Sequence, residues 1–189
     1  MKYLILVMLY YPLYFIHKYR TMSARQKFSV AAEKALNDQV NAELSASYVY
    51  RSMAGFFDRD DVALHGFRDF FKKAAEEETE HAQMFIDYIN KRGGRVTLKA
   101  IGAPKQEWAT ALEALEDALT LEKDVNEKLL AMHAVADNDN DAQMTDFIEG
   151  NFLGEQVDAI KELADMITNV KRVGSEGLGI YLYDKELQA

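Results

Sequence analysis

The sequence predicts an all-α fold: a four-helix bundle with one long crossover and a short fifth helix at the C-terminus. The 189 residues contain only two prolines, Pro12 and Pro104, so long stretches carry no helix breaker. From about residue 29 to residue 173, apolar residues recur three and four positions apart, as on helices with one buried face. Two short links and one long link separate these stretches, which is the layout of a bundle with a single crossover.

The first two helices are expected on either side of a short acidic link. One runs from about Ser29 to Phe57, and the other from about Val62 to Lys91. Residues 58–61 form the link and offer a side chain to cap the second helix. Gly93 and Gly94 follow the last turn, where glycine commonly ends a helix.

The long link extends from Arg95 to Gln106, far enough to travel the length of a bundle. The third helix is expected to begin near Glu107 and to end at the polar run 137–140. The fourth runs from about Asp141 to Val173, and a short apolar piece, Leu178 to Leu187, forms the fifth.

Composition excludes several classes of function. The net charge is −9, which would repel a phosphate backbone, so nucleic acid is not an expected partner. The chain has no cysteine, which rules out disulfides, thiolate nucleophiles and thiolate metal sites. Carboxylate clusters instead favour binding of hard cations.

Residues 1–22 form an apolar extension that we separate from a globular domain at 23–189. Tyr3 to Ile16 is almost wholly apolar, with Lys2 before it and basic residues after it. The run is short for a membrane span, which takes about 20 residues. Three interpretations stay open: a signal peptide, a membrane anchor, or translation that starts at Met22 so that the stretch is not native.

Polar residues interrupt the apolar face of every long helix near its middle. They are Glu43 on the first helix, Glu78 and His81 on the second, Glu122 on the third and Gln156 on the fourth. A buried carboxylate costs several kcal/mol unless it is paired or bound to a metal. No lysine or arginine shares these positions, so a cation is the economical partner.

The spacing of Glu78 and His81 supports a metal site, although Glu-x-x-His alone also recurs by chance in charged helices. Residues three apart lie on one helix face, and Glu-x-x-His inside a bundle is the motif of di-iron carboxylate proteins. Oxygen ligands with one imidazole suit iron or manganese better than structural zinc.

From about Phe28 to Lys185 the chain resembles a eukaryotic ferritin subunit of the heavy-chain, ferroxidase-bearing type. The segments that carry the resemblance are Asn41 to Tyr50 (NAELSASYVY), Phe57 to Leu64 (FDRDDVAL), Glu76 to Ala82 (EEETEHA), Arg92 to Arg95 (RGGR), Leu121 to Asn126 (LEKDVN) and Asp146 to Glu162 (DFIEGNFLGEQVDAIKE).

The resemblance implies a catalytic site that binds two iron ions per subunit and oxidises Fe(II) with dioxygen. Glu43, Glu78 and His81 would form the first iron site, and Glu122 would help form the second, with Glu78 bridging the two. Tyr50 and Gln156 match outer-shell positions. The fourth helix has Gln156 where symmetric di-iron proteins carry a second Glu-x-x-His, so the second site should bind more loosely.

The resemblance also implies a hollow shell of 24 subunits, either a homo-oligomer or a mixture with other ferritin subunits. His133, Asp146 and Glu149 match positions that line an ion channel at the three-fold axes. Leu178 and Leu182 would form an apolar plug at the four-fold axis.

Two departures from the family pattern predict modest mineral nucleation. Gln83 stands where the heavy chain has a third cavity-side carboxylate beside Glu77 and Glu80, and Lys72 and Lys73 stand where light chains cluster acidic residues.

The expected function is iron storage with ferroxidase activity, in the cytoplasm, with no membrane association of the mature domain. A light-chain-like subunit without activity is disfavoured because Glu78 and His81 are both present. A secreted helical signalling ligand would have an apolar core and usually disulfides. A secreted or yolk-type iron carrier with the same site stays open if residues 1–23 act as a signal peptide.

Overall fold

The computed structural model describes residues 23–188, and the extension at 1–22 that the sequence set apart lies outside this range. The elements are α1 (Val30–Phe57), α2 (His65–Lys91), α3 (Ala111–Asn138), α4 (Ala142–Ile148), the π-helix η1 (Glu149–Leu153), α5 (Gly154–Val173) and α6 (Gly177–Glu186). In this range no helix is long and apolar enough to cross a membrane.

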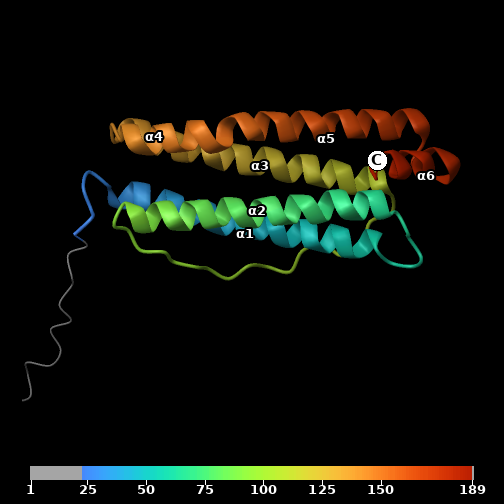
Figure 1. The fold of residues 1–189 in the computed structure, drawn as a ribbon, viewed down its shortest axis with the longest axis horizontal. Helices are drawn as coiled ribbons and strands as arrows, with labels where there is room; N and C mark the ends of the chain where they lie inside the picture. The colour runs from blue at the N-terminus through green and yellow to red at the C-terminus, as the bar shows by residue number, and fades with distance from the viewer. Residues whose placement is uncertain (1–22, 189) are drawn as a thin grey trace, which may run out of the picture.

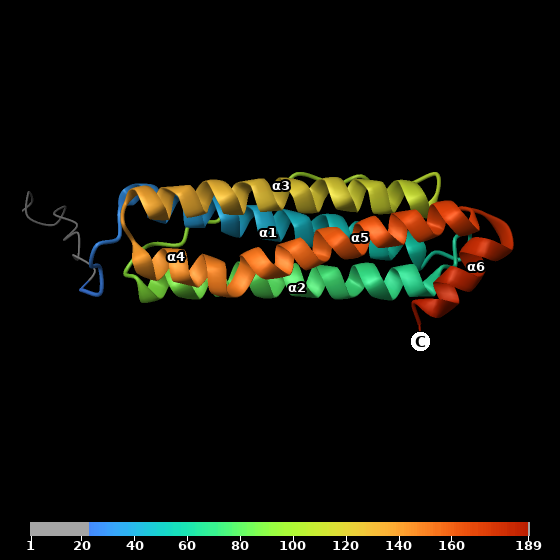
Figure 2. The ribbon, with the colours of Figure 1, turned by 90° about the horizontal axis from the view of Figure 1, so that it is seen from above.

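The long helices form the predicted bundle. In Figure 1, α1 and α2 make one layer, and α3 with the α4–α5 rod makes the other; Figure 2 shows α6 folded across one end. α1 packs against α2 and α3, and α3 packs against α5. The all-α prediction, with one crossover and a short last helix, is confirmed.

The crossover runs along the outside of the bundle beside α1, as the ribbon in Figure 1 shows. Near one end the Thr97 backbone N–H donates to Asn37 Oδ1 over 2.6 Å, and further along Ser52 Oγ donates to the Lys105 carbonyl over 2.7 Å. These bonds satisfy polar groups of α1 and fix the course of the link.

The second helix begins three residues later than the sequence predicts, because its cap comes from elsewhere in the chain. The backbone N–H groups of Gly66 and Phe67 both donate to Oδ1 of Asp184, over 2.7 and 3.1 Å. Asp184 lies on α6 and is fully buried. A Cβ at position 66 would lie 2.1 Å from the Asp184 carbonyl oxygen, so glycine permits the close approach of α6.

The third helix begins at Ala111 rather than near Glu107. Thr110 is extended and its side chain accepts a hydrogen bond from the Glu113 backbone N–H over 3.2 Å, which makes it the N-cap. Trp108 is buried in the core although it belongs to the link.

The predicted fourth helix is interrupted by η1. Around this interruption, four buried residues follow one another every four positions: Met144, Ile148, Phe152 and Gln156. A spacing of four exceeds the 3.6 residues of an α-helical turn, so a buried face of this kind drifts round the rod. The wider π turn takes up the drift and keeps these side chains directed into the bundle, where Phe152 stacks on Phe85 of α2.

The polar residues divide the core into two apolar clusters. One, at the α6 end, is built around Phe57, Phe67 and Phe71; the other, at the α4 end, is built around Leu36, Phe85 and Leu129. Between them lie four buried polar side chains, Glu43, Glu78, Glu122 and Gln156, here called the polar layer. The two clusters hold the helices together while the polar layer lies at mid-length.

Candidate metal centre

Each long helix of the bundle contributes one side chain to the polar layer. Glu43 on α1 is 1% exposed, Glu78 on α2 6%, Glu122 on α3 5% and Gln156 on α5 8%. The buried residues of the described chain include no lysine or arginine. Three carboxyl groups are therefore buried together without a cationic side chain.

Glu43 has an unpartnered oxygen. Its Oε1 accepts a hydrogen bond from Gln39 Nε2 over 2.8 Å, whereas its buried Oε2 has no hydrogen-bond partner among the described residues. An unsatisfied buried acceptor costs about 1–3 kcal/mol. Burial, and secondarily the negative charge of Glu78, raises the pKa of Glu43 well above its ordinary value.

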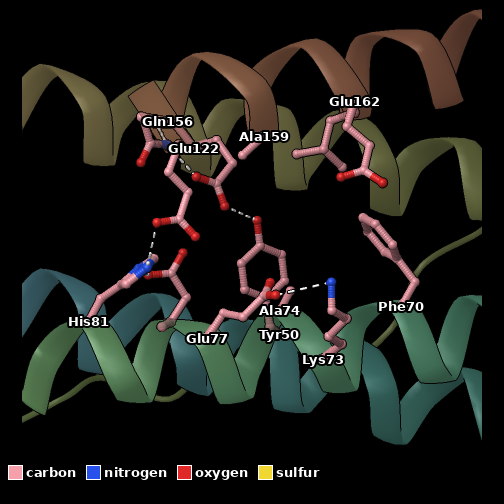
Figure 3. A pocket seen from close by; sticks show the side chains of 13 residues that line it. Tyr50, Phe70, Lys73, Ala74, Glu77, His81, Glu122, Gln156, Ala159 and Glu162 are labelled. Atoms are coloured by element: carbon pink, nitrogen blue, oxygen red, sulfur yellow. Dashed lines mark hydrogen bonds and ion pairs between the residues drawn. The ribbon is translucent and has the colours of Figure 1, made fainter. Parts of the chain in front are cut away.

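Glu122 is held by two neutral donors. The Tyr50 hydroxyl donates to Oε1, and Gln156 Nε2 donates to Oε2 and also to the Glu122 carbonyl oxygen, the latter over 3.0 Å. Figure 3 shows the three side chains converging from α1, α3 and α5. Burial, and secondarily the charge of Glu122, raises the pKa of Tyr50 well above its ordinary value, so the phenol stays protonated and serves as a donor.

Glu78 sits between the other carboxyl groups. Burial, followed by the charge of Glu122, raises its pKa from 4.5 to about 8. At neutral pH the group is mainly protonated, and a bound cation would displace that proton. The raised pKa of Glu78 therefore reflects its burial first and the neighbouring negative charge second.

His81 lies at the edge of the polar layer, with its side chain 19% exposed. Nδ1 is 3.4 Å from Glu78 Oε2, and Nε2 is 3.2 Å from Oε2 of Glu155, the second residue of α5. The ring meets Phe152 edge-on, with centroids 5.6 Å apart.

A small cavity of about 100 Å³ opens beside these residues, between α2 and α5. Four charged side chains form its outer part, here called the mouth: Lys73, Glu77, Glu155 and Glu162. Lys73 Nζ and Glu77 Oε1 are 3.1 Å apart, as the dashed line in Figure 3 marks. The sequence analysis singled out Lys73 and Glu77 but not Glu155 and Glu162. The direction in which the last two side chains point depends on how α5 is rotated against α2.

Gln39 was also missed, although the sequence carries a signal for it. It precedes Glu43 by four positions, the spacing at which helical side chains meet, and it is 1% exposed.

The donor set fits iron. Carboxylate oxygens and one imidazole suit iron, and Glu43 Oε2 accepts no hydrogen bond from the described residues. Between residues 23 and 188, no three histidine or acidic side chains already stand as a metal-binding group. Tyr50 and Gln156 hydrogen-bond to Glu122, and Glu155 hydrogen-bonds to His81, so neighbouring side chains already restrain two of the candidate ligands.

The predicted channel residues lie away from this site. His133 on α3 and Glu149 at the start of η1 are in contact, with His133 Nε2 2.8 Å from Glu149 Oε1. Asp146 is exposed on α4, one turn before Glu149. Leu178 and Leu182 on α6 are 70% and 57% exposed, an apolar face open to solvent in the single subunit.

The structure has a four-helix bundle with one crossover, buried carboxyl groups from three helices and a Glu-x-x-His pair. This arrangement is typical of the class of di-iron carboxylate proteins. Comparison with known proteins narrows the class. A model of the ferritin-like domain matches residues 33–173. Soma ferritin of Lymnaea stagnalis is 56% identical over 164 residues, covering 86% of this chain and 94% of that protein.

Two further relatives agree. The ferritin heavy chain of Echinococcus granulosus is 54% identical over 163 residues, covering 86% of this chain and 94% of that protein. Chloroplastic ferritin-1 of Brassica napus is 49% identical over 169 residues, covering 87% of this chain and 66% of that protein. The chain belongs to the ferritin family of iron-storage proteins, which confirms the resemblance.

Proposed function

We propose that this ferritin subunit is a ferroxidase that oxidises Fe(II) with dioxygen at the polar layer and passes ferric iron on for storage. The observation that carries the proposal is the burial of three carboxyl groups with no cationic side chain among them, one of which leaves an oxygen unpartnered. Such an arrangement is costly unless a cation binds. Iron is here the substrate.

The charge of the site favours a pair of divalent ions. Ionised Glu43, Glu78 and Glu122 supply three negative charges, and neutral His81 adds a nitrogen ligand. Glu43, Glu78 and His81 hold the first ion, and Glu122 helps to hold the second, with Glu78 central enough to serve both. Each Fe(II) gives one electron to dioxygen, and the protein contributes position and charge compensation.

Tyr50 and Gln156 keep Glu122 in place for the second ion. Both donate to its carboxylate oxygens, which fixes its orientation in the way outer-shell partners usually do. Gln156 is neutral and Ala159 has no ligand atom, so the α5 side of the site supplies less charge than the α2 side. This asymmetry allows oxidised iron to leave the second position for the mineral.

Entry of iron depends on assembly, and we propose a shell of 24 subunits, homopolymeric or mixed. His133, Asp146 and Glu149 would line the channels where three subunits meet, and repeated copies of two carboxylates would draw cations inward. The exposed Leu178 and Leu182 on α6 would be covered where four subunits meet.

The test is stopped-flow absorbance after Fe(II) is mixed with the assembled, metal-free protein in oxygenated buffer. We expect a fast ferric signal in the parent and only slow autoxidation in the double variant Glu78→Lys, His81→Gly. Glu80→Lys changes the charge of an exposed residue on the same helix and should retain the fast phase. Coincident traces for parent and double variant would favour a subunit that only stores iron.

The place of action is a second question. We propose a cytoplasmic protein whose working domain is residues 23–189, with secretion as the alternative if residues 1–23 are a signal peptide. Mass spectrometry of the mature N-terminus separates the two: a chain starting at Met22 or Ser23 supports the first, and a start at Ala24 supports the second.

A further inference from the structure

We propose that Glu155 is a positioning residue for the oxidation site: it holds the His81 ring so that Nδ1, and not Nε2, faces the metal ions. This inference rests on the proposed ferroxidase function, because it assigns a role to Glu155 only if His81 binds iron.

The first step is the placement of the two ring nitrogens. Nδ1 faces the interior, 3.4 Å from an oxygen of Glu78, which is 8% exposed in its side chain. Nε2 faces the mouth, 3.2 Å from an oxygen of Glu155, which is 54% exposed. The ring therefore separates a buried carboxyl group from a solvated one.

The second step is the chemistry of a neutral imidazole. One nitrogen carries a hydrogen and the other a lone pair, and an ionised carboxylate can only accept a hydrogen bond. Nε2 lies closer to its carboxylate, 3.2 Å from Glu155, than Nδ1 does to Glu78, at 3.4 Å, so Glu155 favours the form with the hydrogen on Nε2. That form leaves the lone pair on Nδ1, directed toward the polar layer, and metal-binding histidines commonly donate their other N–H to a carboxylate.

The third step is the restriction of the ring. Phe152 meets the ring edge-on and is itself stacked on Phe85, with centroids 4.2 Å apart. This packing limits the tilt of His81 but does not distinguish its two nitrogens. The hydrogen bond to Glu155 supplies that distinction.

Co(II) provides a test that does not depend on oxidation, because its visible absorption reports the ligands at the site. The component of the titration lost in His81→Ala is taken as binding through the imidazole. Relative to the parent, Glu155→Ala should weaken this component about 10–100-fold, the usual effect of losing an outer-shell partner. Glu155→Gln should stay within a few-fold, because the amide oxygen still accepts from Nε2–H.

Glu162→Ala is the matched control. Glu162 also lies on α5 and lines the mouth, so its removal takes away the same charge. The Co(II) affinity of this variant should stay within about threefold of the parent, the size of effect expected for one exposed charge, and its spectrum should be that of the parent.

The outcomes separate the alternatives. Equal losses of Co(II) affinity in Glu155→Ala and Glu155→Gln would mean that Glu155 binds metal itself. Equal losses in Glu155→Ala and Glu162→Ala would mean a general effect of charge. Either result overturns the proposal, and so does an unchanged Co(II) affinity in Glu155→Ala. If His81→Ala itself removes no Co(II) signal, the proposed ferroxidase site has failed, which is a distinguishable result.

Discussion

The polar layer and the proposed channel residues His133, Asp146 and Glu149, here called the channel group, contain the same kinds of side chain in opposite surroundings. Glu43, Glu78 and Glu122 are at most 6% exposed, whereas the side chain of Glu149 is 56% exposed and hydrogen-bonds to His133. In water a carboxylate needs no partner, so in a single subunit the exposed carboxylates of the channel group do not by themselves indicate a bound ion. In the interior each carboxylate has an electrostatic cost, and that cost is what indicates a ligand.

The largest difference should appear in the stability of the metal-free protein. Because burial raises the pKa of Glu78 to about 8, the folded protein keeps a proton that the unfolded chain releases above its ordinary pKa of 4.5. Stability from this group is complete below pH 4.5 and is lost as pH rises toward 8. At pH 7 the cost is about 3 kcal/mol, from 1.36 kcal/mol per pKa unit.

Glu78→Gln should remove that cost. We expect the metal-free variant to unfold at higher denaturant concentration than the parent at pH 8, with the two converging near pH 5. Glu80→Gln, on the exposed face of α2, is the control and should follow the parent. The same pH dependence in parent and Glu78→Gln would contradict the burial argument.

A smaller effect, of a different kind, is expected at the channel group. In Asp146→Asn, Glu149→Gln the ferric signal should form about tenfold more slowly at low ionic strength, and the deficit should shrink at high salt, where exposed charges are screened. Stability should change by less than about 0.5 kcal/mol, since both residues are exposed. A deficit that persists unchanged at high salt would argue against attraction of cations through a channel.

The smallest effect should come from the mouth. Lys73 is 76% exposed in its side chain and lies 3.1 Å from Glu77, where it repels an arriving cation. At about 5 Å in water that repulsion is roughly 1–2 kcal/mol for a divalent ion, and salt reduces it further.

Lys73→Met should therefore tighten Zn(II) binding by about threefold, measured by titration calorimetry at low salt. Lys72→Met removes the same charge one position along the helix, outside the cavity lining, and should have no such effect. If both variants tighten binding equally, the effect belongs to net charge and not to the mouth.

Periodicity was sufficient to predict the helices, the crossover and the polar layer, because each depends on residues close in sequence. The start of α2 could not be predicted in this way, since its cap is Asp184, 118 positions beyond Gly66. Glu155 could not be predicted for a related reason: it faces His81 only because of the rotation of α5. The π turn, by contrast, left a signal in the four-residue spacing of Met144, Ile148, Phe152 and Gln156.

The π turn affects how the α4–α5 helix can contribute side chains to both the channel group and the polar layer. Each residue of an α-helix advances the direction of its side chain by about 100°, so the angle between distant residues is normally fixed by their separation. A wider turn between them changes that angle without changing either end. In this chain η1 lies between Asp146 and Gln156, and it therefore sets the phase of one relative to the other. The exposed carboxylate of Asp146 and the buried amide of Gln156 can thus be directed independently along a single helix.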